Sequence, residues 1–240
     1  MKFGIIGAGP IGTSIAKKLV SNGHEVKVAD ARGIAHLEEK EFVGTPVSAE
    51  EVVQFIDVLI LALPLHVMPS IRRIVEKCDE GVIVVDTSNY YPFRDNQIEE
   101  IENGMVESVW VSNQLRRPII KAFSNLLAYT LAHKGTPVGT TGRIAMAIAG
   151  DNVSQKQIIM DIVNQCGFDT VDAGSIADSW TFQPGTPAYC TELTQEELTE
   201  ALQKANKDKA PLLRDKIMEH FSMEFTHEDI VNLNRKIYNL

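Results

Sequence analysis

The first half of the chain alternates short apolar runs with segments in which apolar residues recur at helical spacing. The apolar runs predict strands over residues 2–6, 25–29, 58–63, 81–87 and 119–123. Helical spacing predicts helices over residues 11–20, 49–55 and 67–77. Strands alternating with helices are typical of right-handed crossovers in a parallel sheet. Runs that are apolar almost throughout are typical of strands covered on both faces.

The same alternation continues past the midpoint and then stops. Residues 143–150 and 169–173 predict two more strands of the same sheet, with a helix over 154–165 between them. The stretch between residues 87 and 119 is rich in Asn and Tyr and is expected to be irregular. After residue 174 only helices are predicted, opened by a capping box at Thr194, by Pro211 and by Thr226.

This pattern predicts an α/β fold in two parts. We expect a doubly wound, mostly parallel Rossmann sheet over residues 1–175 and a small helical C-terminal domain over residues 176–240. The terminal helices carry apolar stripes that so short a segment cannot bury within itself. The stripes contain Ile217, Met218, Phe221, Ile230, Leu233 and Ile237. They predict packing on the sheet domain or on a second copy, and we expect a homodimer.

Composition and charge narrow the class of protein. Twenty-three basic against 32 acidic residues give a net charge of −9, which disfavours nucleic acid and anionic membrane surfaces as partners. The longest nearly apolar run, residues 58–68, is broken by Pro64 and His66 and is too short to span a bilayer. Three cysteines without a CxxC motif and no visible secretory signal favour a cytoplasmic protein whose thiols are buried and reduced.

A glycine motif directly follows the first predicted strand and opens the first helix. Gly7, Gly9 and Gly12 stand in a G-x-G-x-x-G pattern. The first glycine permits a tight turn, the second a close approach of backbone to a pyrophosphate, and the third close packing of helix on strand. In this context the motif predicts a dinucleotide site. A glycine-rich turn without a ligand is the alternative.

Two residues after the second strand give opposite indications about the ribose. Asp30 lies 18 residues after Gly12, where a carboxylate favours the diol of NAD and repels the 2′-phosphate of NADP. Arg32 can bind that phosphate. Alternatively, Asp30 caps a turn and Arg32 is solvated.

The carboxyl ends of the later strands are further candidates, because open α/β sheets bind ligands there. Leu63 and Pro64 are expected to flank the ribose on the nicotinamide side. Polar residues follow the next two strands, and we expect cofactor contacts or ordinary turn chemistry from them. They are Ser88, Asn89, Ser124 and Asn125. His66 could face a hydride acceptor, although a loop histidine with a local partner is the more common case.

No catalytic residue can be assigned from the sequence. Lys121 lies among apolar residues of a strand, where a structural salt bridge is favoured over catalysis. The six histidines show no metal-ligand spacing with each other or with cysteine, so no metal site is expected. Motifs of hydrolases, P-loop proteins and zinc proteases are absent from the sequence.

Several segments together resemble a known family. They are GIIGAGPIG, GHEVKVADARG, LALP, ESVWVSNQL with RPIIKAFSN, VDAGSIADSW and QPGTPAYC, and they span about residues 1–190. The chain is similar to the deazaflavin-dependent NADP oxidoreductases, or coenzyme F-420 reductases. This resemblance implies direct hydride transfer between NADP and a small-molecule acceptor, a deazaflavin or flavin, with no metal. It also implies a dimer.

The resemblance implies diphosphate contacts by Ala8, Gly9, Pro10 and Ile11. The chain departs from the family at Asp30, because members commonly carry Ser or Asn before the arginine. The choice between NADP and NAD is therefore open.

Two other functions fit the glycine motif. A β-hydroxyacid dehydrogenase or pyrroline carboxylate reductase type of enzyme is one, although such enzymes usually carry a larger helical domain than the 65 residues present here. A non-catalytic NAD(P)-binding sensor is the other. The segment 180–190, with its Pro184-Gly185-Thr186-Pro187 turn, resembles an acceptor-site loop and disfavours the sensor.

Overall fold

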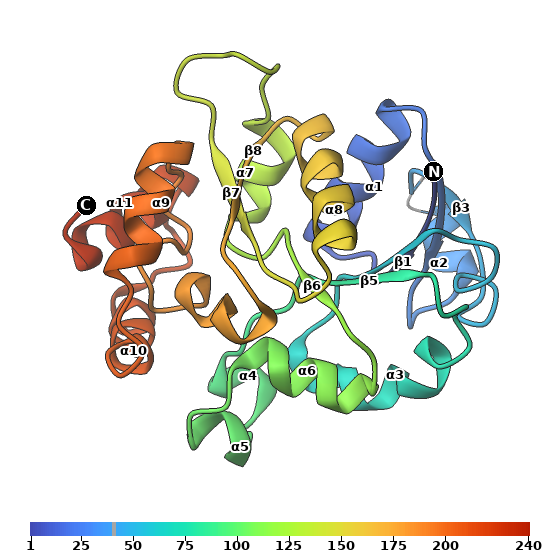
Figure 1. The fold of residues 1–240 in the computed structure, drawn as a ribbon, viewed down its shortest axis with the longest axis horizontal. Helices are drawn as coiled ribbons and strands as arrows, with labels where there is room; N and C mark the ends of the chain where they lie inside the picture. Colours follow the sequence, from blue (N-terminus) through green and yellow to red (C-terminus); the bar gives the residue numbers. More distant parts are fainter. Residues whose placement is uncertain (40–41) are drawn as a thin grey trace.

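The computed structural model of the protein describes residues 1–39 and 42–240 and centres on a six-stranded sheet (Figure 1). The strands lie in the order β3, β2, β1, β4, β5, β6, and every neighbouring pair is parallel. Their bounds are Lys2–Ile6 (β1), Glu25–Ala29 (β2), Thr45–Pro46 (β3), Val58–Leu61 (β4), Ile83–Asp86 (β5) and Ile120–Lys121 (β6). The predicted doubly wound sheet is confirmed, with its change of direction between β1 and β4.

Alternate residues of the central strands face two separate hydrophobic layers. Phe3 and Ile5 of β1 pack with the helices α1 (Pro10–Ser21), α7 (Ala128–His133) and α8 (Val153–Gln165). Ile6 of β1 and Leu61 of β4 pack with α3 (Met68–Val75) and α6 (Glu107–Leu115). Figure 1 shows the two sets of helices above and below the sheet. Because both faces are covered, these strands are apolar almost throughout.

The helix predicted over residues 49–55 does not form. The amide of Val52 donates to the carbonyl of Ser48, and that of Gln54 donates to Glu51, which gives a single turn. Phe55 then takes a positive φ of 54°. A left-handed residue ends helical geometry, and β4 begins three residues later. The predicted helix was therefore wrong.

The region 87–119, expected to be irregular, contains three short helices: α4 (Pro92–Asp95), α5 (Glu99–Glu102) and α6. Helix α6 buries Trp110 and Val111 against α3. Its buried face also carries Glu107 and Ser108. These buried polar residues interrupt the apolar spacing, which is why the helix was missed. Helix α2 (Ile34–Glu39) and α7 were not predicted either.

The last two strands do not extend the main sheet, which corrects the sequence prediction. β7 (Ala145–Ile148) and β8 (Asp169–Asp172) form a separate parallel pair. In the part of the chain that the structure describes, the backbone pairing of this segment with the main sheet is one antiparallel bridge between Ala149, just after β7, and Lys121. Strand β6 has only two residues, and the chain returns beside it in the opposite direction. The edge is therefore too short and wrongly directed for another parallel strand.

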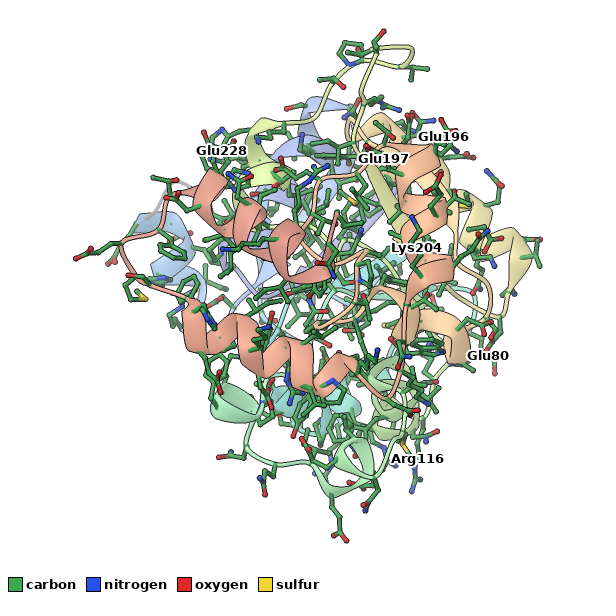
Figure 2. The ribbon with its side chains drawn as sticks, turned by 90° about the vertical axis from the view of Figure 1, so that its left-hand side faces the viewer. Glu80, Arg116, Glu196, Glu197, Lys204 and Glu228 are labelled. Carbon is green, nitrogen blue, oxygen red and sulfur yellow. The ribbon has the colours of Figure 1, made fainter. Side chains whose placement is uncertain are left out.

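Helices cover the C-terminal end of the molecule, as predicted. After the 3-10 helix η2 (Ile176–Phe182) come α9 (Gln195–Lys204), α10 (Ala210–His220) and α11 (His227–Tyr238). Thr194 forms the expected capping box, Thr226 opens the last helix as expected and forms a second one, and Pro211 lies in the first turn of α10. Figure 2 shows these three helices on one face, with Glu196 and Lys204 at opposite ends of α9. Within residues 1–39 and 42–240, every helix is too short or too polar to cross a membrane.

Candidate functional site

Two of the three motif glycines are required by close backbone packing. Gly7 has a φ of +108°, and an added Cβ there would lie 2.2 Å from the carbonyl oxygen of Ala62. A Cβ on Gly12 would lie 2.0 Å from the carbonyl oxygen of Gly7. Helix α1 can therefore approach β1 and β4 closely only without side chains at these positions.

Gly9 differs from the other two, because a Cβ there would have no described atom within 4 Å. Gly9 is the N-cap of α1, makes no side-chain capping bond, and is followed by Pro10 at the first helical positions. The space beside the start of this 12-residue helix is therefore open, and no side chain of Gly9 covers it. Such a helix start attracts an anion through its amides and dipole, and a side chain at Gly9 would occupy that space. The geometry fits a diphosphate.

Asp30 and Arg32 bind each other at the end of β2. The guanidinium of Arg32 donates from Nε and Nη2 to the two Asp30 oxygens, over 2.6 and 2.9 Å. The Ala8 amide also donates to Asp30 over 2.9 Å. The Arg32 side chain, aided by this amide, holds the pKa of Asp30 well below its usual range. The two residues thus form one unit, and the exposed Arg32 partly neutralises the acid.

A cavity of about 370 Å³ lies at the carboxyl ends of the parallel strands. It is lined by three residues of the glycine turn, Gly9, Pro10 and Ile11, and by most of the residues expected at strand ends: Leu63, Pro64, Ser88, Asn89 and Ser124. Ser88 Oγ, Asn89 Oδ1 and Ser124 Oγ are buried and have no hydrogen-bond partner among the described residues. Buried polar atoms without partners are costly, so a polar ligand would stabilise them. Asn125 Oδ1 also lacks a partner in the described part of the chain, but Asn125 is not among the residues that line this cavity, and its Nδ2 donates to the Ala188 carbonyl.

A second cavity, of about 620 Å³, lies on the other side of the glycine turn. The two cavities share Gly9 and Pro10, and the second one includes Ala8 and Arg32. The residues predicted to hold a dinucleotide are therefore brought together along two adjoining cavities. The Asp30–Arg32 unit lies at one end of them, and the strand ends at the other.

Two tyrosines at the far end of the strand-end cavity were missed by sequence reasoning. Tyr91 follows β5, and its hydroxyl donates to the hydroxyl of Tyr189 over 2.9 Å. The two residues are 98 positions apart in the sequence. Both residues line the cavity. Burial raises the pKa of each hydroxyl above its ordinary value, so both are protonated at neutral pH. The available signal was the position of Tyr91 just beyond a strand end and of Tyr189 in the proline-rich loop.

The loop that carries Tyr189 is fastened to the end of the sheet. The amide of Cys190 donates to the carbonyl of Asn125 over 2.9 Å. Cys190 and Phe123, which both line the cavity, have positive φ values of 56° and 57°. Non-glycine residues with such angles are uncommon and are often found at functional sites. The thiols of Cys78, Cys166 and Cys190 are free and buried, as expected.

Lys121 and His66 both have structural partners. Lys121 donates to Asp86 over 2.8 Å and to the Ser88 carbonyl, and both side chains of this ion pair are buried. This confirms the salt-bridge interpretation. His66 Nδ1 lies 2.7 Å from Asp95, and His66 is not among the residues that line the strand-end cavity.

Comparison with known proteins adds to this geometry. Residues 2–90 match the model of a family described as NADP oxidoreductase, coenzyme F420-dependent. Over 108 residues the chain is 39% identical to the protein YjhV of Escherichia coli (strain K12), which covers 44% of this chain and 79% of that protein.

Solved structures share the fold over most of the chain. The hypothetical protein SMa0349 from Sinorhizobium meliloti matches with a TM-score of 0.68 and 29% identity, covering 81% of this chain and 96% of that one. The proposed F420-dependent NADP reductase from Arthrobacter sp. FB24 matches with a TM-score of 0.61 and 18% identity, covering 73% and 86%. The second likeness concerns the fold alone.

Proposed function

The chain belongs to the family of coenzyme F420-dependent NADP oxidoreductases, and from that premise we propose that it transfers hydride directly between a nicotinamide cofactor and a flat, deazaflavin-like or flavin-like acceptor. As a member it is an NAD(P)-dependent oxidoreductase. The observation that carries the proposal is the open backbone at Gly9, continuous with a cavity over the strand ends. We propose NADP as the cofactor, with NAD as an alternative.

The chain's own residues would bind the cofactor in three places. The amides of Gly9 and Ile11 would bind the diphosphate at the start of α1, with the backbone of Ala8 and Pro10 beside it, because the space at Gly9 is free of side chains. Arg32 would contact the 2′-phosphate through Nη1, because its Nε and Nη2 already donate to Asp30. Leu63 and Pro64 form an apolar surface beside the ribose, and the unpartnered atoms of Asn89 and Ser124 provide polar contacts beyond it.

Hydride transfer needs orientation and a dry cleft more than acid–base help. When bound, the reduced nicotinamide supplies two electrons and a proton as hydride, and the second proton of the reduced acceptor comes from solvent. Among the described residues that line the strand-end cavity, Arg94 is the only charged one. The protein's part is therefore to hold two flat groups together, with the tyrosine pair beside them.

A steady-state assay tests this function. NADPH and NADH oxidation should be followed with coenzyme F420 and, separately, with FMN as acceptor. We expect turnover with at least one acceptor and none in the Gly9→Val variant. NADPH binding without turnover on either acceptor would favour the sensor.

We also propose a cytoplasmic homodimer. Leu212 and Met223, on and just after α10, are largely exposed. Of the predicted stripes, Ile217, Met218, Phe221 and Ile230 instead line a cavity between α10, α11 and the rest of the chain. Light scattering at micromolar concentration should give twice the chain mass of 26.6 kDa, and a monomeric mass would contradict the proposal.

A further inference from the structure

A third cavity lies behind the tyrosine pair, under the helices α10 and α11 that cross the face shown in Figure 2. Its volume is about 270 Å³. It shares Tyr91, Leu127, Tyr189 and Cys190 with the strand-end cavity, so the two adjoin. Most of the remaining lining is apolar: Pro184, Gly185, Ile217, Met218, Phe221 and Ile230.

Arg214 is the only charged residue among the described residues that line this cavity. It is 7% exposed, and its Nε donates to Asp215 over 2.8 Å. Its guanidinium lies 5.6 Å from the ring centre of Tyr90. Neither Nη group makes a hydrogen bond within residues 1–39 and 42–240. Neither Nη nitrogen is among the fully buried atoms that lack a partner, so both keep some contact with solvent and are free to pair with an anion.

The fold brings Arg214 to this position through the loop that carries Tyr189. Gly185 has a φ of +92°, and a Cβ there would lie 1.8 Å from the carbonyl oxygen of Ala210. The loop backbone therefore packs directly on the first turn of α10. Arg214 follows Ala210 by one turn on the same helix face, so it lies beside the loop.

The charges around the guanidinium indicate from which side a ligand would reach it. On its other side lies a polar cavity of about 450 Å³ lined by Glu102, Glu107, Asp208 and Lys207. An oxyanion would be repelled by those acids. The apolar cavity has no acid among its described lining residues, so an anion there would meet only the arginine.

We propose that Arg214 binds an oxyanion, a carboxylate or a phosphate, on the second substrate of this enzyme, whose apolar part occupies the cavity between Arg214 and the tyrosine pair. A planar guanidinium pairs with such groups through two parallel hydrogen bonds. The assignment rests on the proposed function, because the occupant is taken to be the hydride acceptor. The anion belongs either to a small free acid or to the acidic side chain of a deazaflavin coenzyme.

The test compares each anionic probe with a neutral compound of similar shape, called its neutral twin. Hexanoate and hexanamide are titrated by calorimetry into NADPH-saturated enzyme. Coenzyme F420 and a deazaflavin with only a neutral ribityl chain are compared by KM. The variants are Arg214→Gln and, as a control that removes one exposed arginine elsewhere, Arg73→Gln. NADPH affinity is measured in each.

We expect Arg214→Gln to weaken one anionic probe at least about tenfold relative to its neutral twin, with NADPH affinity and the Arg73→Gln control unchanged. Loss of hexanoate identifies a small acid, and loss of F420 alone identifies the coenzyme side chain. If Arg214→Gln does not fold, the wild type must still bind one anion at least tenfold more tightly than its twin. If the wild type shows no such preference, the proposed subsite is overturned but the nucleotide site is not. Absence of NADPH binding in the wild type overturns both.

Discussion

The two ends of the cleft are built in different ways. The nucleotide end, the one proposed to hold the cofactor, is made of backbone: Gly7, Gly9 and Gly12 lie within six residues, and Gly7 and Gly12 pack tightly on each other and on Ala62. The acceptor end is made of side chains from distant segments. Tyr91 bonds to a tyrosine 98 residues away, and Arg214 enters from a separate helix.

Because of this difference, substitutions at the two ends should affect ligand binding in different ways. A backbone site binds what every dinucleotide has in common, a diphosphate, and any side chain added to it is harmful. A site formed by side chains on a loop and two helices can change its ligand through single substitutions without disturbing the sheet. We therefore expect variants at the nucleotide end to abolish cofactor binding or folding. Variants at the acceptor end should change selectivity.

The largest expected effect separates the glycines from each other. Gly9→Val should fold normally but weaken NADPH binding by about a thousandfold or more, roughly 4 kcal/mol, because its side chain fills the open space at the start of α1. Gly7→Val should fail to fold, because its Cβ would overlap the Ala62 carbonyl. Calorimetry and circular dichroism measure both. A well-folded Gly9→Val protein with unchanged affinity would refute the site.

The second largest effect is expected from breaking the buried ion pair of Lys121 and Asp86. Lys121 is 2% exposed and Asp86 0%, and Lys121→Met leaves the carboxylate buried without its cation. Losing one partner of a buried pair costs about 3 kcal/mol or more. Urea unfolding should show this loss, and the double change Lys121→Met with Asp86→Leu should recover most of it.

The matched control for this pair is Lys204→Met on α9, where the ion pair with Glu200 is exposed. That change should cost less than about 0.5 kcal/mol. Equal losses in the two lysine variants would mean that the buried pair has no special role.

A buried acid behind the acceptor end predicts a pH effect. Burial raises the pKa of Glu107 to about 7 from an ordinary 4.5. Between these values the folded state holds more protons than the unfolded one, so stability falls as pH rises, by about 3 kcal/mol in all. Glu107→Gln should match the wild type near pH 4 and exceed it at pH 8 in urea unfolding. Glu80→Gln, an exposed glutamate, should keep the wild-type slope.

The sequence predicted the backbone structure of the nucleotide end well, because its determinants are local. Strand, glycine turn and helix follow one another within 21 residues, and β1 and β2 have the predicted bounds. The strand-end residues Leu63, Pro64, Asn89 and Ser124 were found because parallel strands end on one edge of a sheet.

The acceptor end was largely missed, because its determinants are not local. The distance between Tyr91 and Tyr189 depends on a loop that Asn125 holds to the sheet. The position of Arg214 depends on the contact of Gly185 with Ala210. No periodicity carries such information. For the same reason β7 and β8 were placed in the main sheet, since sequence pattern does not reveal the direction of a strand or the length of its neighbour's edge.

The smallest expected effect concerns the choice between NADP and NAD. The two residues that indicate opposite cofactors, Asp30 and Arg32, form one ion pair. The Asp30 carboxylate therefore repels a 2′-phosphate and also binds the guanidinium that would contact this phosphate. Asp30→Asn removes the repulsion and releases an exposed arginine, and the ratio of the Kd values for NADH and NADPH should rise about tenfold. Arg32→Ala should lower this ratio by a similar factor, because Asp30 then meets the ribose alone. The wild-type preference should be below about a hundredfold. Arg73→Ala, which removes one exposed arginine on α3, is the control and should leave the ratio unchanged. If Asp30→Asn leaves it unchanged too, the end of β2 does not contact the ribose, and cofactor choice is made elsewhere along the cleft.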